Sequence, residues 1–301
     1  MKETKFTSSL RWMNSNIRSL RKKGSFKNFS VISAEEASSF IVNSFIKKDF
    51  SLGVIDDLTT LLLYEGLLVE KHVKKDFGKL IYSTYESRLK INEGTLSYKV
   101  LFHIYRESYK AFISFNIAFI ELSKRMRYVL KETKAKTKYV DINDFDKVKD
   151  TIFSLFVERN ILVVSPHENV IKVQYVRLKD IDKYKDSLAF NLSTLNIDKI
   201  IERVDRTSYF EAIDAIKMEL ITYQFDVALI DNDIYSLPLC PIFSSLNTKV
   251  LIVDKRMYSL FDICYGEEYD NDEYTLRIEE FEKERRSSEN TGRFLSNPDN
   301  Y

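Results

Sequence analysis

The stretch that decides the fold is FDVALIDNDIYSLPLCPIFSSLNTKVLIVD, which runs from Phe225 to Asp254. It contains two apolar runs rich in branched residues, FDVALID and TKVLIVD, separated by a helical pattern. A third run of the same kind, RNILVVSP, begins at Arg159. Such continuous runs are typical of strands buried on both faces of a parallel sheet. Because helical patterns alternate with them, the sequence predicts an α/β fold, a Rossmann-like open and mainly parallel sheet with flanking helices.

The turn after the first of these strands reads DNDIYSLPLC and contains no glycine. A dinucleotide fingerprint needs glycines so that the backbone can turn tightly and approach the pyrophosphate. The sequence therefore argues against a Rossmann dehydrogenase. It also contains no P-loop, H-E-x-x-H, G-x-S-x-G or zinc-ligand spacing, and its three histidines, at 72, 103 and 167, leave few options for a histidine-based triad.

Composition sets further limits. The chain has 301 residues, of which 44% are apolar, so it can bury a sizeable core. Its 46 basic and 45 acidic residues nearly cancel, which argues against nucleic acid as a partner. Cys240 and Cys264 show no C-x-x-C spacing, and no apolar run approaches the roughly 18 residues of a membrane span. We therefore expect a reduced, cytoplasmic protein.

The N-terminal segment, residues 1–29, has a basic amphipathic pattern. Between residues 5 and 23 the apolar side chains repeat at steps of four and three, with Trp12 at the border of that face. The basic residues on the remainder include Arg18, Arg21 and Lys22. The segment is expected to be a helix that contacts either its own domain, a partner protein, or the anionic inner face of the membrane.

Residues 30–281 are expected to form one α/β domain, followed by a polar tail at 282–301. Ser33 and Glu36 have the spacing of a capping box before the helix AEEASSFIVNSFIKK. Asp56 or Asp57 is expected to cap the next helix, after the strand FSLGVI. Residues 95–131 show one long helical pattern with an aromatic face, so we expect a helical insertion at about 76–138 that ends in the connector KETKAKTK.

Acidic and polar side chains follow several of the predicted strands. In an open α/β sheet ligands bind outside the carboxyl ends of the strands, and several carboxylates there can hold a divalent cation against a diphosphate. An aspartate after a strand is also a routine helix cap or turn residue, so each position has that alternative. The strand-end residues are Asp56, Asp57, Ser165, His167, Glu168, Asp231, Asp233 and Asp254.

Taken together, the segments resemble the GT-D-type glycosyltransferase family, whose members build bacterial surface polysaccharides and glycosylate adhesins. The resemblance covers about residues 30 to 275 in three blocks. The family's "kPFsIGRfGdgEL" after a helix is matched by SVISAEEASSFIVNSFIKKDFSLGVIDDLTTLLL, and its "gKkVLVIhPF-esI-Qy-kR" by ERNILVVSPHENVIKVQYVRLKDI. Its "FDVALIgcGaYGlpLa-yik-mGKkaIhlGGalQ-lFGIkGkRWdnh" is matched by FDVALIDNDIYSLPLCPIFSSLNTKVLIVDKRMYSLFDICYGEEYDND. The third block is the most specific.

The resemblance implies a transferase that moves a sugar from a UDP-sugar to a glycan acceptor with Mn²⁺ or Mg²⁺. Asp57 would be the metal ligand and, with Asp233, a catalytic residue. The nucleotide-sugar contacts would be Asp231, Tyr235, Asp254, Tyr269 and Asp270.

The departures from the family motifs all fall at the strand ends. Val54 stands where the family has arginine, and Thr59 where it has the second acid of its Asp-x-Glu motif. Its glycines are replaced by Asp231, Asn232, Asp233 and Ser236 in one turn and by Asp254 and Lys255 after the next strand.

The alternative interpretation is a catalytically inactive homologue that stabilises a partner glycosyltransferase. A third interpretation is a nucleic-acid-binding protein that uses the basic helix and KETKAKTK. The balanced charge of the chain disfavours it.

Overall fold

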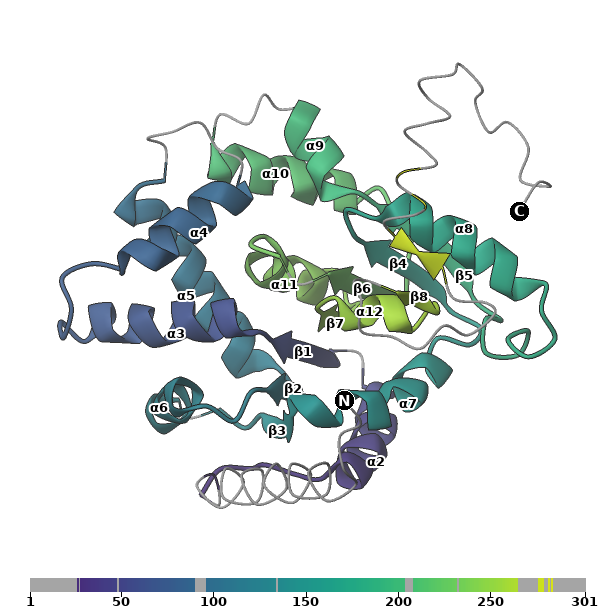
Figure 1. Ribbon diagram of the computed structural model, residues 1–301, viewed down its shortest axis with the longest axis horizontal. Coiled ribbons are helices and arrows are strands. Elements are labelled where there is room, and N and C mark those ends of the chain that lie inside the picture. The colour runs from purple at the N-terminus through teal and green to yellow at the C-terminus, as the bar shows by residue number, and fades with distance from the viewer. Residues whose placement is uncertain are drawn as a thin grey trace, which may run out of the picture.

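A seven-stranded sheet in which every neighbouring pair is parallel forms the centre of the molecule (Figure 1). The computed structural model describes residues 26, 28–47, 49–89, 96–133, 135–203, 208–231, 233–264, 276–278, 281 and 283. The strand order is β3-β2-β1-β7-β6-β4-β5. The strands are β1 (Ser51–Ile55), β2 (Ile117–Ile120), β3 (Lys138–Asp141), β4 (Asn160–Val164), β5 (Asn191–Leu195), β6 (Val227–Asp231) and β7 (Lys249–Val253). The predicted open, parallel α/β fold is confirmed.

Helices connect these strands, and a small pair of strands follows them. The helices are α2 (Ala34–Phe45), α3 (Asp57–Glu70), α4 (Lys79–Leu89), α5 (Tyr98–Ser114), α6 (Lys124–Glu132), the 3₁₀ turn η1 (Ile142–Lys147), α7 (Lys149–Ser154), α8 (Glu168–Lys179), α9 (Ile197–Arg203), α10 (Tyr209–Leu220), α11 (Ser236–Ser245) and α12 (Arg256–Ser259). The short strands β8 (Ile263–Cys264) and β9 (Leu276–Arg277) pair in parallel.

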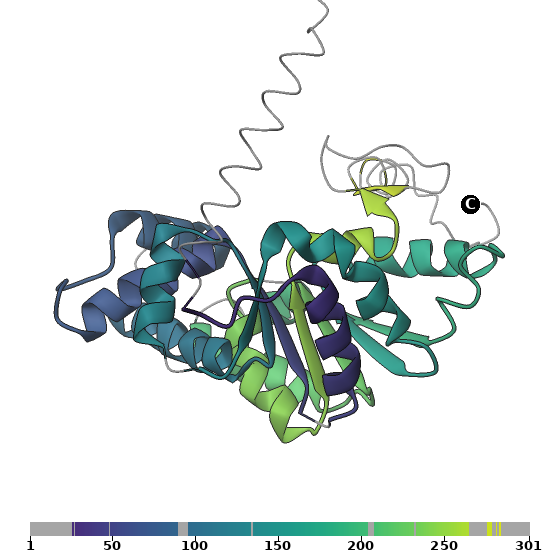
Figure 2. The same ribbon diagram turned by 90° about the horizontal axis from the view of Figure 1, so that it is seen from below.

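The two faces of the sheet bury two separate apolar cores. Successive side chains of a strand point to opposite faces, so Ala228 and Ile230 of β6 enter one core while Val227 and Leu229 enter the other. The first core is covered by α3, α4, α5, α6, α9, α10 and α11, and the second by α2, α7, α8 and α12. Figure 2 shows the layers from below, with helices on both sides of the strands. Burial on both faces explains why these strands read as continuous apolar runs.

Two predicted helix starts are confirmed in detail. The Ser33 hydroxyl accepts the Glu36 N–H at 3.2 Å, and the Glu36 carboxylate accepts the Ser33 N–H at 2.9 Å, which completes the capping box. Asp56, not Asp57, caps α3, because its carboxylate accepts the Thr59 N–H at 2.7 Å. Asp57 is the first residue of the helix and is exposed.

The stretch 95–131 differs from the long helix expected there. It contains the whole of β2, which lies between α5 and α6 and pairs with β1 and β3. Its run FNIAFI is long enough for a strand, and Ser123 starts α6 by accepting the Met126 N–H at 3.2 Å. Phe119, assigned to the aromatic helix face, instead packs in the second core against Phe145. The aromatic spacing continued by chance across a helix end, and the pairing of the strands overrode it.

The connector at 131–138 leads from α6 into β3 of the same sheet and therefore does not separate two domains. Trp12, Arg18, Arg21 and Lys22 lie outside the described residues, as do Tyr269 and Asp270. Among the helices that the structure describes, none has the length and apolar character needed to cross a bilayer.

The order of the strands creates one point in the sheet at which the direction of winding reverses. From β1 the chain moves outward to β2 and β3, and it then crosses to β4 on the other side of the sheet. The direction of winding reverses between β1 and β7, which are hydrogen-bonded neighbours. In open α/β sheets the ligand crevice forms at such a reversal, outside the carboxyl ends of the strands.

Candidate functional site

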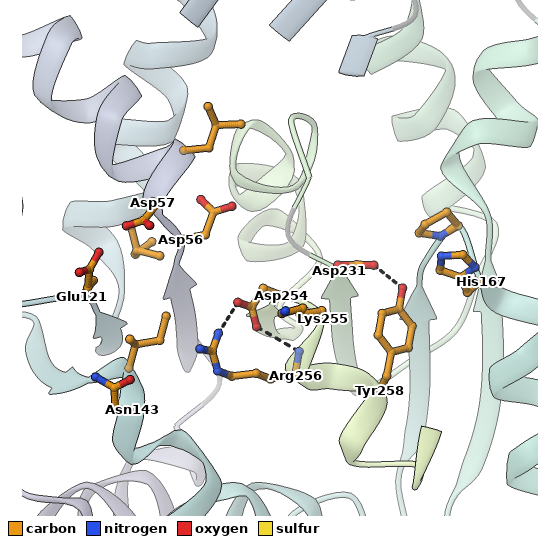
Figure 3. Close-up of a pocket in the computed structure, with 14 residues that line it drawn as sticks. Asp56, Asp57, Glu121, Asn143, His167, Asp231, Asp254, Lys255, Arg256 and Tyr258 are labelled. Atoms are coloured by element: carbon orange, nitrogen blue, oxygen red, sulfur yellow. Dashed lines mark hydrogen bonds and ion pairs between the residues drawn. The ribbon is translucent and has the colours of Figure 1, made fainter. Parts of the chain in front are cut away.

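A pocket of about 800 Å³ opens at this carboxyl edge (Figure 3). The lining residues follow β1, β2, β3, β4, β6 and β7, so all but one strand of the sheet contributes. They are Ile55, Asp56, Asp57, Leu58, Glu121, Ile142, Asn143, Pro166, His167, Asp231, Asp254, Lys255, Arg256 and Tyr258. The strand ends that the sequence analysis named as candidate ligand positions therefore lie at the edge where this pocket opens.

One wall of the pocket is the first turn of α3. The Asp56 carboxylate is held by the backbone of its own helix, whereas Asp57 is exposed and lies beside it in Figure 3. Thr59, at the position of the family's second acid, is 7% exposed and does not line the pocket. This wall thus presents one carboxylate that is not used as a cap.

The opposite wall is a hydrogen-bonded chain centred on Tyr258. The Tyr258 hydroxyl donates to the Asp231 carboxylate, so it accepts from the Ser165 hydroxyl, 3.0 Å away. Ser165 in turn accepts the backbone N–H of His167 at 3.1 Å. The His167 ring meets the Tyr258 ring edge-on, with centroids 5.6 Å apart. This series of hydrogen bonds fixes the ends of β4 and β6 relative to α12.

The third part of the site follows β7. Asp254 forms an ion pair with the Arg256 guanidinium and also accepts the Arg256 backbone N–H at 3.1 Å. Burial raises the pKa of the Asp254 carboxyl, and the charge and N–H of Arg256 oppose that rise. Lys255 is exposed next to this pair and lines the pocket. The only cationic side chains of the described lining are therefore Lys255 and Arg256.

The charges of the pocket do not balance. Five carboxylates line it, those of Asp56, Asp57, Glu121, Asp231 and Asp254, against the two cations. A bare diphosphate would be repelled by such a surface, and a bound cation would relieve the repulsion. Among the described residues no group of three histidine, cysteine or carboxylate side chains has the geometry of a metal site.

The sequence-predicted site residues separate into two groups. Asp57, Asp231 and Asp254 come together in the pocket. Asp233 is not part of the lining, because its Oδ1 accepts the N–H groups of Tyr235 at 2.7 Å and Ser236 at 3.0 Å. Tyr235 is 4% exposed and stacks on Tyr209 in the first core, with ring centroids 5.6 Å apart.

Burial raises the pKa of Asp233 to about 7, the nearby Asp231 adds to the rise, and the two N–H groups oppose it. Because it accepts these two N–H groups, the Asp233 carboxylate stabilises the turn before α11.

Four polar lining residues were not identified from the sequence: Glu121, Asn143, Arg256 and Tyr258. Glu121 follows β2 and Asn143 follows the edge strand β3, and neither segment was predicted to be a strand. Tyr258 is only 2% exposed, so it packs in the core as well as lining the pocket. Only the strand-end rule applied after β7 points to it, since it follows Asp254 by one helical turn.

Comparison with known proteins gives two structural neighbours. Both are structures of the domain of unknown function 1792, one described as highly conserved with a distinct glycosyltransferase fold and the other as its selenomethionine form. They give TM-scores of 0.40 and 0.39, each with 10% identity over 87% of this chain and 97% of the other. Neither a protein-family model nor a curated protein sequence matches the chain. A likeness of this extent concerns the course of the chain and not its chemistry.

Proposed function

We propose that the chain is a glycosyltransferase-like protein whose carboxyl-edge pocket binds a UDP-sugar together with Mn²⁺ or Mg²⁺. The observation that carries the proposal is the position of Asp57. It is an exposed carboxylate on the first turn of α3, in a pocket at the reversal point of a parallel sheet. It also occupies the place of the first acid in the GT-D motif that the sequence resembles.

The described residues fit a nucleotide-held cation better than a cation held by protein alone. Mg²⁺ in nucleotide sites usually takes one or two carboxylates, and phosphate and water supply its other ligands. Asp57 is the carboxylate best placed for this, because Asp56, Asp231 and Asp254 already have hydrogen-bond or ion-pair partners. When bound, the cation would neutralise the leaving diphosphate.

The remaining residues would bind and orient the substrates. Lys255 and Arg256 would face the diphosphate, with Arg256 held in position by Asp254. Asp231, oriented by Tyr258, would accept a hydrogen bond from a sugar hydroxyl. The glycan acceptor, the role in bacterial surface polysaccharide synthesis and the location at the inner face of the membrane follow the family resemblance and belong to the proposal.

One observation favours the alternative of a catalytically inactive homologue that stabilises a partner glycosyltransferase. In a glycine-rich phosphate turn, backbone N–H groups at the start of the helix point to the ligand's phosphate. Here the N–H groups of Tyr235 and Ser236 are bonded to the carboxylate of Asp233. The chain thus provides its own anion where a diphosphate would bind.

The experiment is a thermal-shift titration of the purified chain with UDP and a panel of UDP-sugars, with and without Mn²⁺. A ligand at about 100 times its Kd stabilises the folded state by about 2.7 kcal/mol, which raises the Tm by several degrees. We expect a rise that depends on Mn²⁺ and is lost in Asp57→Asn. Asp214→Asn is the control, since Asp214 lies on α10 and its side chain is 73% exposed.

A response that is flat for every UDP compound would contradict the sugar-nucleotide proposal. Co-purification of a glycosyltransferase with the flat-responding chain would then support the alternative.

A further inference from the structure

A second pocket, of about 440 Å³, lies between α5 and α10 and shares no residue with the acidic pocket. Its lining residues are Lys99, Phe102, His103 and Arg106 of α5 and Phe210 of α10. The four α5 residues follow the spacing i, i+3, i+4, i+7 and therefore form one face of the helix. Aromatic rings and cationic side chains thus alternate on a single surface.

The rings provide flat apolar walls. The Phe210 ring meets the His103 ring edge-on, with centroids 5.0 Å apart, and Phe210 is 37% exposed. Phe102 is partly buried and stacks on Tyr98 at 5.6 Å with an interplanar angle of 13°. An aromatic ring left this accessible beside others in a hollow is a typical feature of ligand surfaces.

The two cations beside these rings, Lys99 and Arg106, have no partners among the residues that the structure describes. Lys99 and Arg106 are exposed, and neither forms a hydrogen bond or ion pair with any residue that the structure describes. The nearest acid on α5, Glu107, is paired with Lys110 at 2.6 Å. Burial lowers the pKa of His103, so its ring stays mostly neutral at neutral pH and adds little positive charge to that of Lys99 and Arg106.

This combination restricts the ligand. A cationic ligand would be repelled by Lys99 and Arg106, and a purely apolar one would leave both cations unused. An acid group can pair with the Arg106 guanidinium, while a planar ring attached to it stacks on the aromatic walls. We propose that this pocket binds a flat ring carrying an acid group, the shared chemistry of nucleotides and aromatic carboxylates.

The test is a calorimetric titration of the full chain with three probes in the presence of EDTA, which keeps metal-dependent nucleotide binding out of the acidic pocket. Adenosine monophosphate represents the nucleotide and indole-3-acetate the aromatic carboxylate, and adenosine is the ring without the acid group. At least one acidic probe is expected to bind saturably. Adenosine is expected to bind at least about 5-fold more weakly than the monophosphate if the nucleotide is the ligand, since one charge-assisted contact is lost.

Two variants test the two halves of the pocket. Arg106→Gln removes the charge and Phe210→Ser removes the exposed ring, and each is expected to weaken binding by about 5-fold or more. Lys124→Gln, on α6, is the control for the charge and Met218→Ser, on α10, is the control for the ring, because both residues are exposed and lie outside the pocket lining. Binding by the controls and by Asp57→Asn is expected to match that of the unmodified chain.

The outcomes separate clearly. Binding of the monophosphate alone supports the proposal with a nucleotide as the ligand, and binding of indole-3-acetate, alone or with the monophosphate, supports it with the wider class. Saturable binding by neither acidic probe overturns it, and so does binding that Arg106→Gln or Phe210→Ser leaves unchanged. Binding that Asp57→Asn abolishes also overturns it, because the ligand would then lie in the acidic pocket.

Discussion

Tyr258 and Tyr209 are both 2% exposed, yet their hydroxyl groups lie in opposite situations. The Tyr258 hydroxyl joins Ser165 to Asp231, whereas the Tyr209 hydroxyl is buried and forms no hydrogen bond with any residue that the structure describes. Leaving a buried polar group unsatisfied costs free energy, and removing an unsatisfied one relieves that cost. The pair therefore offers a matched test of the hydrogen-bonded wall of the acidic pocket.

We predict that Tyr258→Phe lowers the free energy of unfolding by about 1 to 2 kcal/mol, because Asp231 loses a donor and Ser165 an acceptor. Tyr209→Phe is expected to change it by less than about 0.5 kcal/mol or to stabilise the fold. Urea unfolding of both variants at pH 7 measures the two effects. Equal losses would show that the hydrogen-bonded chain contributes nothing beyond the packing of the ring.

At the scale of the element, the turn between β6 and α11 shows how the chain bends where the GT-D motif that it resembles has glycines. The Asp233 N–H donates to the Ser236 hydroxyl at 2.9 Å, and the Ser236 hydroxyl donates to the Asp233 carbonyl at 2.7 Å. The Asp233 carboxylate accepts the N–H groups of Tyr235 and Ser236, so side-chain hydrogen bonds stabilise the turn in place of the backbone freedom of glycine. The turn is closed by its own polar groups.

Because the pKa of Asp233 is raised to about 7 in the folded state, from an ordinary 3.8, this turn makes stability depend on pH. Between these values the unfolded chain has lost the proton that the folded chain keeps, so the free energy of unfolding falls as the pH rises. Asp233→Asn retains the acceptor and removes the titration. We predict that the variant gains about 3 kcal/mol over the unmodified chain between pH 4.5 and pH 7.5.

Urea unfolding at several pH values measures this gain. Asp214→Asn, which changes an exposed carboxylate on α10, is the control and is expected to show no such trend. No gain across this range would mean that the two N–H groups hold Asp233 ionised throughout it.

Local sequence signals predicted most of the elements and only half of the candidate site. The capping box at Ser33 and the cap at Asp56 depend on a few neighbouring residues, so the sequence was sufficient for them. The strands β2, β3 and β5 were missed, since β2 continues an aromatic spacing and the other two are short edge strands with polar residues. Tyr258 and Glu121 enter the pocket only through the order of the strands, which no local pattern determines.

At the scale of the whole molecule, the strand order creates both the acidic pocket and a gradient of protection across the sheet. The strands β1, β7 and β6 have a hydrogen-bonded neighbour on each side and helices over both faces. At the edges, β3 and β5 have a neighbouring strand on one side only, and on its outer side β3 forms a single parallel bridge between Tyr139 and Val31. Three of the five residues of β5 retain exposure, whereas all four of β2 are buried.

We expect this gradient to appear in the rates of amide hydrogen exchange under native conditions. Backbone amides open with free energies that approach the global value in central strands and fall toward zero at edges. We predict that the peptides containing 228–231 and 250–253 exchange slowest, and that those containing 138–141 and 191–195 exchange at least about 10-fold faster.

The peptide containing 117–120 is the decisive one. As β2 it has a neighbour on each side, so its exchange is expected to match that of the central strands. As the continuation of the helix that the aromatic spacing indicates, it would lie outside the sheet and exchange at the rate of the flanking 124–132. Mass spectrometry of pepsin fragments measures all of these peptides in one experiment. Fast exchange at 117–120 would contradict the strand order on which the pocket depends. Slow exchange there would confirm β2, which the aromatic spacing of the sequence did not predict.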